Sequence, residues 1–156
     1  MSENEIREIT ERLLPKIRSV AETVGVTLGA SCEDAPPHLK KYVTTDATAK
    51  FIFENFAASE YMQTGAFIVA SPTFLDELNT RFEERDGELA ENELFAFAGE
   101  GDGSFYVFNI RDRSVHLIDF AQWCSPGRNW ERCCLESWNS ISLFCDRCRD
   151  HWAEDE

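Results

Sequence analysis

The feature that most constrains this sequence is a series of three apolar segments separated by two polar turns, within residues 94–120. The segments cover residues 94–98, 105–110 and 115–120. The first connection reads Gly99-Glu100-Gly101-Asp102-Gly103, a composition typical of tight turns. Short connections between consecutive strands predict an antiparallel meander. Because residues 105–110 are apolar on both faces of a strand, we expect them to form the central strand.

The first 25 residues predict an interrupted helix. Apolar residues recur at helical spacing over 6–24 and give the segment one apolar face. Pro15 interrupts this pattern, and we expect it to kink or divide the helix because proline cannot donate a backbone hydrogen bond. Gly25 is a suitable stop signal.

Local signals predict the remaining elements. Two helices come first, one led by Pro37 and one capped by Thr45 or Asp46. A buried strand over 65–70, a helix capped by Ser71 and running through Phe82, and a last helix from near Ser137 follow. For the run 51–53 a strand is the alternative to the helix. The last helix carries an apolar stripe at helical spacing, formed by Ile141, Phe144, Cys145, Cys148 and Trp152.

The net charge restricts the classes of partner. The chain has 15 basic and 29 acidic residues, so its formal charge is −14. Such a charge disfavours binding to nucleic acid or to anionic lipid, because phosphate binding requires Lys and Arg. It favours either a basic protein partner or plain solubility. No linker divides the chain, and its 156 residues predict a single domain over residues 1–156.

The sequence carries no sign of membrane insertion or secretion. No apolar run approaches the ~18 residues of a membrane span. The start Met1-Ser2-Glu3-Asn4-Glu5 is acidic, whereas a signal peptide has a basic start followed by an apolar segment. We therefore expect a cytoplasmic protein that does not bind membranes. Nothing in the sequence indicates the oligomeric state.

Two interpretations fit the six cysteines, which are Cys32, Cys124, Cys133, Cys134, Cys145 and Cys148. In a cytoplasmic chain we expect reduced thiols or a metal site, not disulfides. The pair Cys145-Asp146-Arg147-Cys148 places two thiols on one helix face, so a zinc site completed by Cys124, Cys133, Cys134 or His151 is one interpretation. The favoured interpretation is that both thiols pack as small hydrophobes on the apolar stripe, with no metal and no cofactor. A strong zinc motif needs two pairs of ligands. The second pair here would be the adjacent Cys133 and Cys134, which chelate poorly.

The sequence lacks the common motifs of enzymes. It has no Gly-x-Ser-x-Gly elbow, no His-Glu-x-x-His pair and no phosphate loop. The histidines His38, His116 and His151 are scattered, and we expect His116 and Asp119 on opposite faces of a strand. A Cys–His–Asp triad can be drawn, but only geometry defines a triad. We therefore expect a protein that is not an enzyme and has no catalytic residues.

Residues 94–120 also resemble part of a known family. The stretch Leu-Phe-Ala-Phe-Ala-Gly-Glu-Gly-Asp-Gly-Ser-Phe-Tyr-Val-Phe-Asn-Ile, followed by Val-His-Leu-Ile-Asp, resembles the core hairpin of the SUKH superfamily of Smi/Knr-type proteins. The order of the predicted helices and strands is similar to that family as well. The chain departs from it because residues 56–65 lack a Gly-Gly turn and because region 124–148 is rich in cysteine.

The resemblance implies an α+β fold, with a central, mostly antiparallel sheet flanked by N-terminal and C-terminal helices. It also implies protein binding instead of catalysis. Bacterial members are commonly immunity proteins that neutralise toxins, many of them nucleases, and fungal members are regulatory scaffolds. The expected function is that of an immunity protein for a toxin. The alternatives are a regulatory or scaffold protein with a non-toxin partner, and a small zinc-binding module.

The expected partner-binding surface is acidic. A nuclease toxin needs basic groups to hold phosphate, and an inhibitor can mimic that phosphate with carboxylates. Two polar segments that border the predicted sheet supply such carboxylates, which are Glu83, Glu84, Asp86, Glu88, Glu100 and Asp102. The alternative for the same residues is a solvated loop on an acidic protein.

Overall fold

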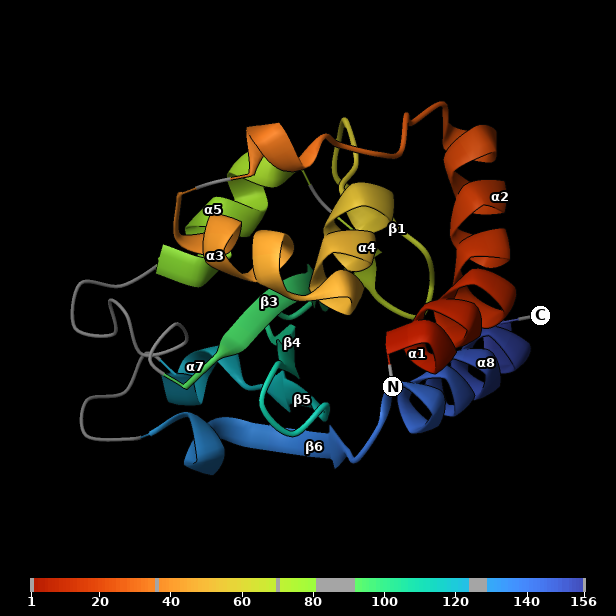
Figure 1. Ribbon diagram of the computed structural model, residues 1–156. Coiled ribbons are helices and arrows are strands. Elements are labelled where there is room, and N and C mark those ends of the chain that lie inside the picture. The colour runs from red at the N-terminus through yellow and green to blue at the C-terminus, as the bar shows by residue number, and fades with distance from the viewer. Residues whose placement is uncertain (1, 36, 70, 81–91, 124–128, 156) are drawn as a thin grey trace.

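A six-stranded antiparallel sheet forms the centre of the molecule (Figure 1). The computed structural model describes residues 2–35, 37–69, 71–80, 92–123 and 129–155. The strands lie side by side in chain order, as β1 (Met62–Gln63), β2 (Ile68–Val69), β3 (Leu94–Gly99), β4 (Phe105–Asn109), β5 (Val115–Ile118) and β6 (Cys134–Trp138). Helices precede and follow these strands, so the fold is α+β and the predicted class is confirmed.

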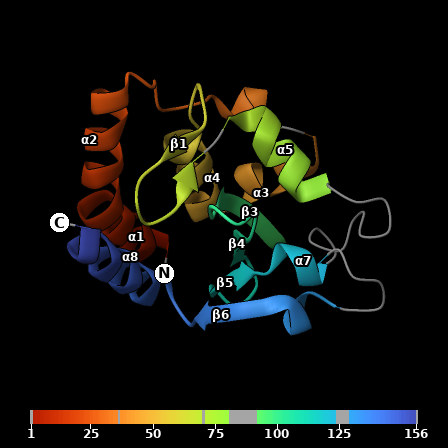
Figure 2. The same ribbon diagram turned by 180° about the vertical axis from the view of Figure 1, so that it is seen from behind.

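Two groups of helices pack around the sheet (Figures 1 and 2). The first group contains α3 (Pro37–Thr45), α4 (Ala47–Phe56) and α5 (Pro72–Thr80), and both α4 and α5 contact β3. The second contains the N-terminal helical segment and α8 (Ile141–Asp155), which pack against each other. Three short helical segments complete the described chain, and they are η2 (Cys32–Asp34), α7 (Phe120–Trp123) and η4 (Trp130–Cys133).

The N-terminal helical segment is continuous but irregular. It passes from α1 (Ser2–Glu8) through a π-helical turn, η1 (Ile9–Leu13), into α2 (Leu14–Val24). Pro15 lies in the first turn of α2, and the π-helical turn before it removes the need for the hydrogen bond that proline cannot donate. The segment therefore changes helix type where a kink or division was predicted. Gly25 ends α2 in the left-handed conformation, with φ of 77°.

Capping side chains explain where α4 and α5 begin. Asp46 Oδ1 accepts a hydrogen bond from the backbone N–H of Ala49 at 2.9 Å, so the helix interpretation is confirmed and the strand alternative for 51–53 is wrong. Ser71 Oγ accepts from the N–H of Phe74 at 3.3 Å and begins α5 as predicted. Phe82, expected within that helix, lies outside the described residues.

The predicted meander is confirmed. β4 pairs antiparallel with β3 on one side and with β5 on the other, and all of its residues are buried. The Gly99–Gly103 turn joins β3 to β4, and Gly103 adopts a φ of 94°, which a residue with a Cβ rarely adopts. The central strand is therefore the one expected from its two apolar faces.

The two edges of the sheet differ from the prediction. Neither β1 nor β6 was expected, and the strand predicted over 65–70 is reduced to β2. Ser137, expected to begin the last helix, instead pairs with His116 in β6. The buried ring of Trp138 packs on Phe144, with ring centroids 5.4 Å apart, and anchors β6 to the core. The helix begins at Ile141 instead, after Ser140 caps it.

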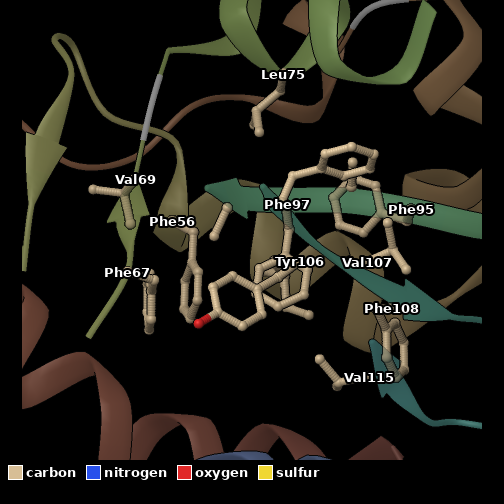
Figure 3. Close-up of a cluster of buried hydrophobic side chains, with 14 of the residues drawn as sticks. Phe56, Phe67, Val69, Leu75, Phe95, Phe97, Tyr106, Val107, Phe108 and Val115 are labelled. Carbon is tan, nitrogen blue, oxygen red and sulfur yellow. The ribbon is translucent and has the colours of Figure 1, made fainter. Parts of the chain in front are cut away.

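An aromatic cluster joins the sheet to both groups of helices (Figure 3). Phe56 of α4 stacks on Phe67, with ring centroids 5.9 Å apart. Phe67 and Phe97 both contact Phe144 of α8, at 6.1 and 5.8 Å between centroids. Tyr106 of the central strand lies 5.3 Å from the same ring. One continuous core therefore holds all the layers together.

A side chain of α5 takes the place of a strand partner at β3. β3 has a bulge between Ala96 and Ala98. Asn79 Oδ1 accepts from the N–H of Ala96 at 3.0 Å, and Asn79 Nδ2 donates to the carbonyl of Ala96 at 3.1 Å. One amide side chain thus satisfies both backbone groups of a strand residue and fixes α5 against the sheet.

Candidate functional site

The structure describes two of the six carboxylates predicted to bind a partner. Glu83, Glu84, Asp86 and Glu88 lie outside the described residues. Glu100 and Asp102 lie in the turn between β3 and β4. Asp102 Oδ1 accepts from the N–H of Ser104 at 2.9 Å, and the Asp102 side chain is exposed.

Glu100 makes internal contacts that the sequence did not reveal. Arg147 of α8 reaches it with Nη2 3.4 Å from Oε1, and the hydroxyl of Tyr106 donates to the same oxygen. Burial, together with the hydrogen bond to Glu100, raises the pKa of Tyr106, so the phenol stays protonated. The charge of Glu100 is therefore compensated within the molecule, and Asp102 is the exposed acid of this turn.

A hollow of about 210 Å³ lies beside this turn, and we name it the tyrosine hollow. Its apolar walls are Tyr61, Ile68, Phe74 and Leu78, and its floor is the glycine-rich β3–β4 turn. The Tyr61 side chain is 62% exposed and meets Phe74 edge to face, with ring centroids 6.4 Å apart. An exposed aromatic ring above an apolar hollow is typical of surfaces that bind other proteins.

A second hollow, of about 450 Å³, is more polar, and we name it the histidine hollow. Its lining includes Asn109, Asp112, His116, Trp130 and Ser137. The His116 ring meets the Trp130 ring edge to face, with centroids 5.0 Å apart. The β4–β5 turn, η4 and β6 together position these side chains.

A chain of hydrogen bonds fixes the protonation of His116. Its Nε2 lies 2.7 Å from Ser114 Oγ, and its Nδ1 lies 2.7 Å from Ser137 Oγ. Because Ser114 donates its only hydroxyl proton to Asp112, it must accept from the Nε2–H of the imidazole. Nδ1 is then unprotonated and accepts from the hydroxyl of Ser137. Burial lowers the pKa of His116 despite the nearby charges of Asp112 and Glu131, which favours this neutral form.

The bond between Ser137 and His116 has two possible uses. A serine hydroxyl that donates to a neutral, oriented imidazole is the pairing that activates a serine nucleophile. The same bonds also satisfy half-buried polar groups on a sheet, which is their ordinary structural role. The absence of enzymatic activity stays a prediction.

Sequence reasoning missed this chain of residues. Of these residues only His116 lies in a strand, because β5 begins at Val115. Asp112 and Ser114 belong to the β4–β5 turn, so no strand period linked them to His116. Asp119, the residue first considered beside His116, instead caps α7, where its Oδ1 accepts from the N–H of Ala121 at 2.9 Å.

The thiols of the apolar stripe are core residues, as predicted. Cys145 and Cys148 are fully buried on α8. Burial raises the pKa of Cys145 to about 12 and raises the pKa of Cys148 as well, so both stay protonated and unreactive near neutral pH. Cys133 is also buried, and burial raises the pKa of the half-buried Cys134 to about 11. Cys124 lies outside the described residues.

Metal binding gains no support from the described part of the chain. There, no group of three or more His, Cys, Asp or Glu side chains is arranged to hold a metal ion. The zinc alternative therefore depends on Cys124, whose position the structure does not describe, and the expected absence of metal stays a prediction. Among the described ranges, no helix combines the length and the apolarity needed to cross a membrane.

The fold and the two hollows define an α+β protein with a sequential six-stranded meander. Comparison of the chain with family models, with curated proteins and with solved structures found no significant match. Membership of the SUKH superfamily therefore stays a prediction from the sequence of residues 94–120.

Proposed function

We propose that the protein is a non-catalytic module that binds a basic protein partner, and specifically an immunity protein that neutralises a toxin. The observation that carries this proposal is the distribution of charge. Acidic residues outnumber basic ones by 29 to 15. An excess of this size attracts basic surfaces and repels phosphate.

Ion pairs within the molecule engage several arginines and still leave most of the acidic excess for a partner to meet. They join arginines to carboxylates, and they include Arg12–Glu8, Arg12–Asp146, Arg111–Glu93, Arg113–Glu5, Arg113–Asp46 and Arg147–Glu100. Many acidic side chains are exposed at the same time, among them Glu3, Glu11, Glu22, Glu60, Glu77, Asp102, Glu131 and Glu136. The described surface therefore presents more acid than base to a partner.

Toxin neutralisation fits this charge distribution. A nuclease must present basic groups where it holds phosphate, and carboxylates can occupy that site while speeding the encounter. The resemblance of residues 94–120 to SUKH proteins supplies the expectation of an immunity role. The net charge supports a basic protein as the partner, and the resemblance supports a role in immunity to a toxin.

The experiment that tests the proposal uses the product of the reading frame directly upstream of this gene. Cells that express that product are grown with and without this chain. Restored growth together with a purified complex supports immunity. A complex without an effect on growth supports the regulatory or scaffold alternative, and the absence of any complex contradicts a role in neutralising that product.

The electrostatic part is tested by stopped-flow association with the same product. The on-rate should fall as salt rises, because exposed charges are screened beyond roughly 10 Å at 0.1 M salt. Reversal of Glu83, Glu84 and Asp86 to Lys should slow association, whereas the matched reversal of Glu3, Glu11 and Glu22 should have a smaller effect. An on-rate indifferent to salt and to both reversals would remove charge as the basis of binding.

A further inference from the structure

We infer that the tyrosine hollow is the docking groove for a basic polypeptide segment that inserts one large apolar side chain. This inference rests on the proposed function and identifies the part of the surface that binds the partner. The hollow lies between Tyr61, which precedes β1, Ile68 of β2, α5 and the β3–β4 turn. Figure 2 shows the molecule from the side on which β1 and α5 lie in front.

The walls of the hollow favour an apolar occupant. Phe74 and Leu78, on successive turns of α5, form one wall, and Ile68 of β2 contributes to another. Tyr61 is 62% exposed although it is aromatic, and its edge-to-face contact with Phe74 places it at the rim. A buried aromatic or aliphatic anchor beside Tyr is the usual centre of binding energy at a protein interface.

The floor of the hollow allows a backbone to come close. It contains Gly99, Gly101 and Gly103. A Cβ added at Gly101 would meet no atom within 4 Å, so the space above this residue is open. Glycine in such a floor lets another chain approach the backbone directly.

Acidic residues that adjoin the lining of the hollow in sequence favour a basic occupant. Glu60 precedes Tyr61, Glu77 precedes Leu78, and Asp102 lies between Gly101 and Gly103. All three side chains are exposed, and within the described ranges none of them forms an ion pair. Unpaired carboxylates next to lining residues of an apolar hollow complement Lys and Arg residues that flank an apolar anchor. A second copy of this chain, with its own charge of −14, is a poor occupant.

Three synthetic peptides test the inference by fluorescence anisotropy with the full chain. The first is Lys-Arg-Lys-Phe-Lys-Arg-Lys, the second replaces its Phe with Ser, and the third is the acidic Glu-Asp-Glu-Phe-Glu-Asp-Glu. The basic peptide with Phe should bind about tenfold more tightly than its Ser counterpart, because the anchor fills the hollow. This preference for Phe should persist at higher salt, whereas the affinity of both basic peptides should fall.

Variants locate the binding site. Tyr61→Ser removes the exposed ring and Phe74→Ser removes the wall ring that it contacts, so each should abolish the preference for Phe. The matched control is Leu135→Ser on β6, which removes another exposed apolar side chain, 55% exposed, and should leave the preference unchanged. Asp102→Lys should weaken both basic peptides more than Glu22→Lys does.

The outcomes separate the groove from the proposed function. If the basic peptides bind but no preference for Phe exists, or if the preference survives both Tyr61→Ser and Phe74→Ser, the groove is wrong while binding of a basic partner stands. If the wild-type chain binds the basic peptides no better than the acidic one, charge attraction fails, and both inferences fail with it. Loss of the preference in both variants and its retention in Leu135→Ser supports the groove.

Discussion

Arg113 joins three segments that are far apart in the sequence. It lies in the β4–β5 turn with a φ of 66°, a left-handed conformation that is uncommon for a residue other than glycine. Its Nη2 lies 2.5 Å from Glu5 of α1, and its Nη1 bonds to Asp46, the cap of α4. Burial acts to lower the pKa of Arg113, but the bonds to both carboxylates outweigh it and raise the pKa, so the guanidinium stays charged.

Replacement of Arg113 by Ala should lower the free energy of unfolding by about 3–5 kcal/mol, because two largely buried carboxylates lose their partner. The side chains of Glu5 and Asp46 are each only 12% exposed. Urea denaturation measures the change. The matched control is Arg111→Ala in the same turn, whose side chain is 69% exposed and whose pairing with Glu93 should contribute at most about 1 kcal/mol. Equal effects of the two variants would contradict the structural role of Arg113.

Protonation of His116 should lower the stability of the protein in mild acid. Burial lowers its pKa in the folded state below the ordinary value of 6.5, so the unfolded chain binds this proton more readily. The contribution of His116 is therefore complete above about pH 6.5 and is lost as the pH falls toward the folded-state pKa, with a slope of at most about 1.4 kcal/mol per pH unit.

The measurement compares urea denaturation of the wild type and of His116→Gln between pH 7.5 and pH 5. Because the two proteins share every other titratable group, the difference between them isolates His116. The wild type should lose more stability than the variant over this range. If the free energies of unfolding of the two proteins change in parallel with pH, the protonation of His116 does not affect stability.

At the scale of elements, the attachment of α5 to β3 depends on one amide side chain. Asn79 also donates from Nδ2 to the carbonyl of Leu75 at 2.8 Å, within its own helix. Asn55 of α4 makes the same contact with Phe51 at 2.9 Å but, among the described residues, forms no hydrogen bond to the sheet. The two asparagines thus differ in the pair of bonds to Ala96.

The change Asn79→Ala should therefore destabilise the protein by about 1–3 kcal/mol more than Asn55→Ala, because it leaves the N–H and the carbonyl of Ala96 without partners. Chemical denaturation of both variants gives the difference, and hydrogen exchange at the Ala96 amide reports it locally. If exchange at Ala96 is unchanged in Asn79→Ala, the side chain does not act as a strand partner.

The apolar stripe of α8 predicts inert thiols. In the native protein at pH 8, brief treatment with iodoacetamide should leave Cys145 and Cys148 unmodified, because burial keeps them protonated and inaccessible. Mass spectrometry after digestion measures modification at each cysteine. The half-buried Cys32 serves as the accessible control, and the same reaction in urea should modify every cysteine. Modification of Cys145 in the native protein would contradict its place in the core.

At the scale of the whole molecule, the sequence predicts the interior better than the edges. Residues 94–118 carry a clear pattern because both faces of β4 are buried, so apolar runs and turns alone determine the meander. β6 was missed because most of its side chains are exposed and only Trp138 is buried. β1 and β2 are two residues long, too short for any period to be detected.

The candidate site was predicted less completely than the fold. Glu100 forms an ion pair with Arg147, 47 residues away in the sequence, and no local pattern reveals an ion pair over such a separation. The tyrosine hollow likewise combines Tyr61, β2, α5 and the β3–β4 turn, which are separate in the sequence. Sequence patterns reveal faces of elements, whereas a surface depends on how the elements pack.

The packing of η1 and α1 against α8 has a consequence for synthesis on the ribosome. Arg12 bonds to Asp146, a residue synthesised 134 positions later. At about 5–20 residues per second, that interval lasts roughly 7–27 s. During this time the apolar face of the first helices has no access to the helix that covers it in the native protein. The segment formed by α1, η1 and α2 is therefore enclosed long after it is made, and a chaperone has that interval in which to bind it.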